Sequence, residues 1–486
     1  MRMQYPRESE MRGGRVPRWA GGCPVIGGCV FILILAVLLP TTAFSQTPQA
    51  TIRGQVADSS ESPIPNALIR VVNEETNATL QSSSGPRGEY VFSTLKPGSY
   101  RIEAEHSGFR KYVERGIQLS VGQSLRLNIP MDPGGPAEEM VVTARRDLVE
   151  PDTTHSGTVI ENHQITRFPL DGRNFLQLSL LVPGTAPAAQ GSPGTVRGEF
   201  AVNVSGARED SNNFILDGAF NNDPKLNGVS INPPVDAIRE FEILTSTYDA
   251  SYGRSGGAQV SIAMKSGTNE FHGTAYEFFR NAALDAKNYF ERAESSAARY
   301  QRNQFGFSLG GPVRKDRTFI FLDYEGRRTR EGVTRVTNVP TDLERAGDFS
   351  QSIFAPPINP YTQSRFENDQ IPTELVNSAG KAIADLYPKP NRMVSGQNYV
   401  SSPIRRDRDD RFDVRLDHAI TAKSSLIARY SFADSDLYEP FSGRTYANIP
   451  GYGVQVPRRA QNFMLGQDHT FSCNLINQLR FALNRV

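Results

Sequence analysis

Apolar and polar residues alternate along much of the second half of the chain, with the two-residue period that is typical of β-strands. The pattern predicts strands at 268–280, 304–310, 318–328, 411–418, 424–433, 461–471 and 476–485. In the fourth of these strands the alternation is strict. Its two faces would carry Phe412, Val414 and Leu416 on one side and Asp413, Arg415 and Asp417 on the other.

The connectors between these strands alternate in length. Long connectors run over 281–303, 329–410 and 434–460, and short ones over 311–317, 419–423 and 472–475. Tight turns on one side and long loops on the other are typical of an outer-membrane β-barrel, which predicts an antiparallel transmembrane barrel with apolar faces toward lipid. A soluble propeller or sandwich is the alternative, but it has no need for connectors of about 80 residues on one side only.

Shorter alternating runs separated by turn residues fill 50–131 and predict a small antiparallel β-sandwich. The runs lie at 51–56, 67–73, 88–95, 98–106 and 124–131. Residues 132–150 follow as a linker that begins with Pro and Gly. Residues 151–266 are rich in Asn, Gly and Ser and predict a compact α+β module with a short helix at 175–181.

The first 45 residues predict a secretory signal peptide. Five arginines precede an apolar run from Val25 to Leu39, and Ala43-Phe44-Ser45 follows as a cleavage signature. A membrane anchor is the alternative, but a span needs about 20 apolar residues. Translation from Met11 would shorten the basic region. Export would leave Cys473 as the only cysteine, so the mature chain would form no internal disulfide.

Composition narrows the function further. With 53 Lys and Arg against 52 Asp and Glu, the net charge of +1 argues against a nucleic-acid partner. Mean hydropathy of −0.42 excludes a bundle of membrane helices. Neither a zinc motif nor a phosphate-binding loop occurs, so we expect no enzyme, cofactor or metal. The Asp-rich stretch 407–410 is a calcium candidate, but its alternating arginines favour a solvated barrel rim. Asn221-Asn222-Asp223 near Asp217 is a better candidate, although a turn explains it equally well.

The sandwich region resembles the carboxypeptidase-regulatory-like domain, a transthyretin-like, carbohydrate-binding-like β-sandwich. The resemblance rests on Gly54-Gln55-Val56, Pro65-Asn66-Ala67, Gly88-Glu89-Tyr90-Val91-Phe92, Leu95-Lys96-Pro97-Gly98-Ser99-Tyr100 and Ser107-Gly108-Phe109. The family implies no peptidase here, because no zinc ligands are present. Aromatic rings in this region serve either as stacking platforms for sugars or as core residues: Tyr90, Phe92, Tyr100, Phe109 and Tyr112.

Motifs after residue 211 resemble the plug and first barrel strand of TonB-dependent transporters of the Oar-like group. They are 212–218, 252–257, 265–269 and 271–273, in the family's order. The plug motif residues are Asp217, Gly218, Tyr252, Gly253, Arg254, Gly256 and Gly257. Ser251 and Met264 depart from the usual pattern, which has an acid and Thr there.

Between the sandwich and the plug lies a short extended apolar stretch that resembles a TonB box, the segment offered to the energy-coupling protein TonB by strand addition. Its residues are Glu139, Met140, Val141, Val142, Thr143 and Ala144. The alternative is the last edge strand of the sandwich.

The resemblance implies an exported protein of the outer membrane of a Gram-negative-type bacterium. It would move an unknown ligand, such as a glycan, a siderophore or a protein, with TonB, outer-membrane lipid and the barrel-assembly machinery as partners. The alternative is a surface protein that binds carbohydrate or protein through the sandwich, with the barrel as anchor. Residues 267–486 supply seven strands of a barrel of about 22, so we expect a truncated barrel.

Overall fold

A computed structural model describes residues 49–134, 139–143, 156–192, 195, 200–248, 252–253, 255–286, 299–394, 396–441, 448–472 and 475–486. The predicted signal peptide and Cys473 lie outside the described residues. Contacts divide the chain into residues 1–44 and residues 45–486, and every described residue belongs to the second unit. None of the helices in the described parts is long and apolar enough to cross a membrane.

Residues 50–143 form two sheets that face each other across one apolar core. The first sheet holds β1 (Ala50–Asp58), β4 (Glu89–Leu95), β7 (Ser124–Arg126) and β8 (Ile129–Met131). The second has the order β3 (Thr79–Ser83), β2 (Leu68–Asn73), β5 (Gly98–Glu105), β6 (Lys111–Leu119) and β9 (Glu139–Thr143). The sandwich is mixed rather than purely antiparallel, because β1 pairs parallel with β7 and β8, and β6 pairs parallel with β9.

The plug is built on a five-stranded mixed sheet. Its order is β10 (Ser156–Glu161), β15 (Ile238–Ser246), β16 (Gln259–Met264), β13 (Asn213–Leu216) and β14 (Ala219–Phe220). Helix α2 (Asn162–Arg167), the ribbon of β11 (Thr185–Pro187) and β12 (Val202–Val204), and the 3₁₀ turns η1 (Asp171–Arg173), η2 (Phe175–Leu181), η4 (Glu209–Ser211) and η5 (Val235–Ala237) complete it. The helix expected at 175–181 is therefore 3₁₀.

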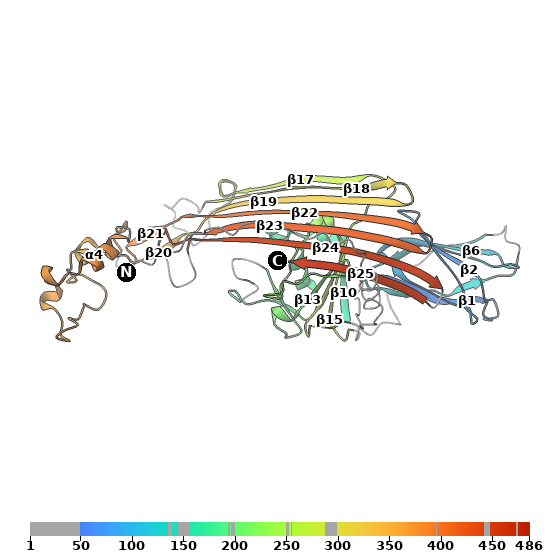
Figure 1. The fold of residues 1–486 in the computed structure, drawn as a ribbon, viewed down its shortest axis with the longest axis horizontal. Coiled ribbons are helices and arrows are strands. Elements are labelled where there is room, and N and C mark those ends of the chain that lie inside the picture. The colour runs from blue at the N-terminus through green and yellow to red at the C-terminus, as the bar shows by residue number, and fades with distance from the viewer. Residues whose placement is uncertain are drawn as a thin grey trace, which may run out of the picture. The chain divides into compact units, whose positions relative to one another are not determined.

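Seven long antiparallel strands form the third part (Figure 1). They are β17 (His272–Asn281), β18 (Tyr300–Arg314), β19 (Thr318–Gly332), β22 (Ile404–Thr421), β23 (Ser424–Glu439), β24 (Val454–Ser472) and β25 (Leu475–Arg485), paired in that order. Each overlaps a strand expected from the alternation, and several are longer than expected. Among the described residues the sheet is not closed, and β17 and β25 are its edges.

The two faces of this sheet differ as the alternation predicts. Asp413, Arg415 and Asp417 are buried on the inner face, at 1%, 4% and 2% exposure. Their neighbours Phe412 and Val414 are half-buried on the other face. One side of the wall therefore carries buried charge and the other carries apolar surface.

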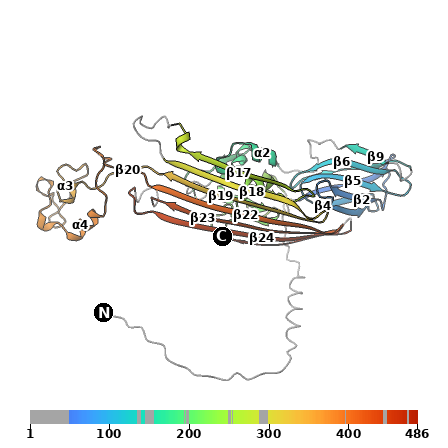
Figure 2. The same cartoon turned by 90° about the horizontal axis from the view of Figure 1, so that it is seen from above.

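The connector 333–403 is folded. It contains β20 (Arg335–Thr337), β21 (Tyr399–Ser401), α3 (Asp342–Arg345), α4 (Ser378–Asp385) and the turns η7 (Glu367–Asp369) and η8 (Thr373–Leu375). A different connector, the one after β17, begins with the turn η6 (Ala282–Leu284). β20 and β21 pair where the connector leaves and rejoins the wall, and α3 and α4 contact each other (Figure 2). Val339, Tyr399 and Ile449 form a small core there.

Candidate functional site

The plug packs directly against the inner face of the seven-stranded wall. Phe321 of β19 and Ala460 of β24 belong to the same apolar cluster as the plug residues Phe175, Phe241 and Ile262. Apolar burial therefore continues from the plug into the barrel wall. Within this interface lies a group of charged residues.

Asp217 and Gly218 form the two-residue turn between β13 and β14. Their φ angles are +50° and +85°, and Leu216 pairs with Ala219 across the turn. Positive φ at both central positions defines a type I′ hairpin turn, which favours Asp-Gly. The turn points the Asp217 carboxylate out of the plug sheet, where Oδ1 accepts a hydrogen bond from the backbone N–H of Met264 at 3.0 Å.

Arg415 of β22 faces this carboxylate from the barrel wall. Its Nη1 donates to Asp217 Oδ1 at 3.0 Å and to the carbonyl oxygen of Met264 at 2.9 Å. Its Nε and Nη2 donate to the two carboxylate oxygens of Asp417 at 2.9 and 3.2 Å. The guanidinium is thus fixed by a bidentate carboxylate on its own strand while it holds the plug turn.

Arg429 of β23 holds the same turn from the neighbouring strand. Its side chain is fully buried, with Nε 3.1 Å from Asp217 Oδ2. Its Nη2 donates to the carbonyl oxygen of Leu216 at 3.2 Å and to Asn462 Oδ1 at 2.8 Å. Two barrel arginines therefore converge on one plug carboxylate.

Lys96 of the sandwich completes the group by pairing with Asp417. We refer to Lys96, Asp217, Arg415, Asp417 and Arg429 as the plug–wall ion cluster. Buried ion pairs contribute little net stability because desolvation offsets their attraction, but removing one partner leaves an uncompensated charge at a cost of about 3–5 kcal/mol. The cluster is thus suited to fixing one position of the plug rather than to catalysis.

Weaker polar contacts surround the cluster. Arg411 Nη1 donates to the carbonyl oxygen of Asn232 at 3.0 Å, and Asn484 Nδ2 to that of Asn222 at 2.8 Å. Near the outer end, Arg302 Nη1 bonds Asp171 Oδ1 at 2.8 Å, but the Asp171 side chain is 74% exposed. The plug is thus held along β18, β22 and β25 as well, and Arg173 Nε of the plug lies 3.6 Å from Oε2 of the buried Glu325 on β19.

The remaining plug-motif residues lie at the other end of the same strand pair. β13 and β16 run parallel, with Asn213 opposite Gln259 and Leu216 opposite Ile262. Gly257 precedes β16 and donates its N–H to the carbonyl oxygen of Ser211, and a Cβ there would lie 2.7 Å from that oxygen. Tyr252, Gly253 and Gly256 are in the same loop, and Arg254 lies outside the described residues. The structure does not bring the described residues Tyr252, Gly253, Gly256 and Gly257 together with Asp217 and Gly218.

Five of the six TonB-box-like residues, Glu139–Thr143, form the whole of β9, which pairs with β6 of the sandwich. Met140 and Val142 pack against the sandwich core, whereas Val141 is 57% exposed. Ala144 lies outside the described residues. The strand that the sequence offered as either a sandwich edge or a TonB box is therefore an edge strand in this structure.

Side chains suggested as calcium ligands have other partners. Asn221 and Asn222 bond backbone groups of Ile231, Phe214 and Asn212. The carboxylates of Asp407, Asp409 and Asp410 pair with Arg327, Arg411 and Arg328. Within the described parts of the chain, no group of three His, Cys, Asp or Glu side chains is placed to hold a metal ion.

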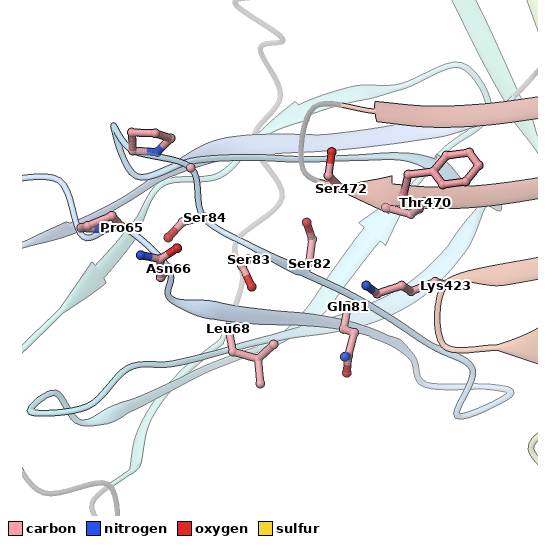
Figure 3. Close-up of a pocket in the computed structure, with 13 residues that line it drawn as sticks. Pro65, Asn66, Leu68, Gln81, Ser82, Ser83, Ser84, Lys423, Thr470 and Ser472 are labelled. Carbon is pink, nitrogen blue, oxygen red and sulfur yellow. The ribbon is translucent and has the colours of Figure 1, made fainter.

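A pocket of about 600 Å³ lies between the sandwich and two turns of the barrel wall (Figure 3). Its lining mixes polar and apolar side chains and comprises Pro65, Asn66, Leu68, 81–86, Lys423 and 470–472. The aromatic rings proposed as sugar platforms are not part of this lining. Tyr90, Phe92, Tyr100 and Tyr112 are at most 5% exposed and fill the sandwich core.

Two segments of the chain match known protein families. Residues 263–486 match the outer membrane beta barrel domain, and residues 51–132 match the carboxypeptidase regulatory-like domain. The chain thus carries a barrel domain of the outer membrane behind a regulatory-like β-sandwich. It is similar to the TonB-dependent transporter Oar of Myxococcus xanthus, with 26% identity over 322 residues, which confirms the resemblance inferred from the motifs.

The match to Oar covers 63% of this chain and 29% of the relative, so the chain spans less than a third of that protein. Among solved structures, the match to the outer membrane transporter YddB from Escherichia coli covers 67% of this chain and 38% of the YddB chain, at 10% identity and a TM-score of 0.43. The match to a mutant of the ferric enterobactin receptor PfeA from Pseudomonas aeruginosa covers 68% of this chain and 40% of the receptor chain, at 12% identity and a TM-score of 0.43.

Sequence reasoning missed two members of the ion cluster. Arg415 and Asp417 were expected on the inner face, because alternation placed them there. Arg429 also follows this alternation, but nothing local distinguishes it from other inward residues of β23. Lys96 lies in a sandwich turn, and its partner is 321 residues away in the sequence.

Proposed function

We propose that this chain acts as a TonB-dependent outer-membrane receptor or transporter. Ligand binds the outer loops and the apex of the plug, the segment at 139–144 is offered in the periplasm, and TonB pairs with it and pulls. Energy from the inner-membrane proton gradient then remodels the plug. The chain itself performs no covalent chemistry.

The observation that carries this proposal is the plug–wall ion cluster. Asp217 is held by two buried arginines of the wall, and both also bond backbone carbonyl oxygens of the plug. A barrel that served only as an anchor has no need for a plug fixed by costly buried charges. Such a plug suits a gate that opens only when work is done on it.

The plug topology supports a partial opening. The segment 139–144 is followed in the chain by β10, which among the described strands is an edge of the plug sheet and pairs with β15. Asp217 and Gly218 connect β13 and β14, at the opposite edge. A pull on 139–144 therefore loads β10 first, while the ion cluster holds the far edge in place.

Outward residues of the wall support a lipid environment for these strands, and we propose the barrel-assembly machinery as the partner that folds them. Exposed apolar side chains recur at every second position of β25, at Leu479, Phe481 and Leu483, with 60%, 60% and 59% exposure. Such an apolar face suits contact with hydrocarbon.

Proline substitution in the TonB-box-like segment tests the proposal. Val141→Pro removes a backbone N–H that strand addition needs, so we expect the chain to bind the purified periplasmic domain of TonB at least about tenfold more weakly. Val141→Thr keeps both the donor and the β-branched shape and is the matched control. Equal affinity of the Pro variant and the unmodified chain, measured by calorimetry, would contradict the proposal.

A further inference from the structure

The TonB-box-like segment is occupied as a strand within the sandwich. β9 lies beside β6 at one end of the second sheet (Figure 2). In the register Tyr112 is opposite Met140 and Glu114 is opposite Val142. The pairing is parallel and extends over five residues. The carboxypeptidase regulatory-like domain thus holds this segment by the same kind of backbone pairing that a partner would use.

Side chains of β9 are divided between the core and solvent. Met140 and Val142 pack against the apolar core of the sandwich, and Val141 between them points outward with 57% exposure. In strand addition, backbone hydrogen bonds supply affinity and pockets for alternate side chains supply specificity. A partner that reads Met140 and Val142 therefore has no access to them while β9 is in place.

β9 is also held less firmly than the inner strands of this sheet. It is an edge strand, and its two inward residues are only partly buried. By comparison, Tyr100, Ile102 and Ala104 of the inner strand β5 are 5%, 0% and 0% exposed. Short edge strands with few buried contacts open at low free energy, so β9 is suited to reversible release.

We propose that the sandwich is a clamp for residues 139–143, and that these residues bind either β6 or TonB but not both. The clamp lowers the affinity for TonB by the fraction of chains in which β9 is released. Release of β9 from β6 then allows TonB to bind residues 139–143 and to open the plug. This inference rests on the proposed function, because it names how access to the same segment is regulated.

A disulfide across the two strands tests the clamp. In a full-length chain with Cys23, Cys29 and Cys473 replaced by serine, Val113→Cys and Val141→Cys occupy positions that face each other in the register. We expect the oxidised form to bind the periplasmic domain of TonB at least about tenfold more weakly than the reduced form. Equal affinity of the two forms would overturn the clamp.

A second pair in the same sheet serves as the matched control. Arg70→Cys and Gln81→Cys face each other across β2 and β3 and leave β9 untouched. Oxidation of this pair should change TonB affinity by less than about twofold, because β9 still leaves β6 freely. A loss equal to that of the first pair would attribute the effect to general stiffening and overturn the clamp.

Hydrogen exchange separates the clamp from the proposed function. In the chain without TonB, amides of 139–143 should exchange at least about tenfold more slowly than in a peptide of the same residues. Added TonB should speed exchange in 111–115, because β6 loses its partner. Peptide-like exchange in the free chain, or unchanged protection of β6 when TonB binds, would overturn the clamp. Absence of TonB binding to the reduced chain, with 139–143 still protected, would instead refute the proposed function alone.

Discussion

The sandwich and the plug–wall interface are stabilised in different ways. The largest fully buried side chains of the sandwich are apolar, among them Phe92, Ile52 and Ile102. Its buried tyrosines stay neutral, and burial raises the pKa of Tyr100 to about 12. At the plug–wall interface, by contrast, the side chains of Arg415 and Arg429 are 5% and 0% exposed.

This difference separates a permanent core from a releasable one. Apolar packing is non-directional and is lost gradually as surfaces part. A buried guanidinium is compensated only while its carboxylate stays in place. A displacement of Asp217 therefore removes the carboxylate that pairs with Arg429 and one of the two carboxylates that pair with Arg415. The sandwich is therefore expected to persist while the plug has two distinct positions, seated and released.

The largest expected effect comes from the sandwich core. Phe92→Ala removes a ring that is 2% exposed, and we expect the free energy of opening of the sandwich to fall by about 3–5 kcal/mol. Hydrogen exchange measured by mass spectrometry would detect the loss in peptides of β1 and β4 but not in β13 and β16. Phe354→Ala, at a 60% exposed position, is the control with no expected change. Equal loss in the plug peptides would show that the two regions are one cooperative unit.

Removing the charge of the plug turn tests the other side of the comparison. Asp217→Asn leaves Arg415 and Arg429 without their plug carboxylate. We therefore expect the free energy of opening of β13 and β14 to fall by about 3 kcal/mol.

Asp171→Asn is the matched control, because Asp171 also joins the plug to a barrel arginine but is exposed. For this variant we expect the free energy of opening of the plug strands to fall by less than about 1 kcal/mol. Equal effects of the two variants on exchange in the plug peptides would contradict the role given to burial.

The barrel strands were predictable because their faces differ, but their lengths were not. β22 begins at Ile404, seven residues before the strand expected at 411. Its added part is charged on both faces, so no alternation reveals it. Cross-strand ion pairs hold it extended, with Arg328 bonded to Asp410 at 2.7 Å and Arg408 paired with Asp434.

Two sandwich strands escaped sequence analysis for a different reason. In β6 the pairing shifts where Tyr100 faces Ile117 and Ile102 faces Glu114, so the strand holds one extra residue around Gly116, whose φ is +76°. A bulge breaks the two-residue period. β3 is short and polar, and only its pairing with β2 makes it a strand.

The candidate site was predictable in part. The Asp217-Gly218 turn carries a local signal, because a hairpin with two positive φ angles favours that pair of residues. The cluster's other members Arg415, Arg429 and Lys96 are brought together by the packing of three segments that are distant in the sequence. No local sequence pattern predicts these contacts. The parallel pairing of β9 with β6 is non-local in the same way.

Alanine substitutions at two glycines with the same φ angle give the smallest expected effect, and they compare the plug turn directly with a sandwich turn. Gly218 in the plug turn and Gly108 in a sandwich turn both have φ of +85°, and a Cβ on Gly108 meets nothing within 4 Å. Alanine in this conformation costs about 1–2 kcal/mol at either site. At position 108 we expect the cost to stay within the sandwich, where exchange in β5 and β6 would rise slightly.

At position 218 the same strain acts on the residue next to Asp217, whose carboxylate has three partners across two domains. The turn has no freedom to relax without moving that carboxylate, so exchange should rise in β13, β14 and β16 together. The Asp217→Asn change should then remove most of the added effect of Gly218→Ala, because the two act through one contact. Strictly additive effects in the double variant would show that the turn and the ion cluster are independent.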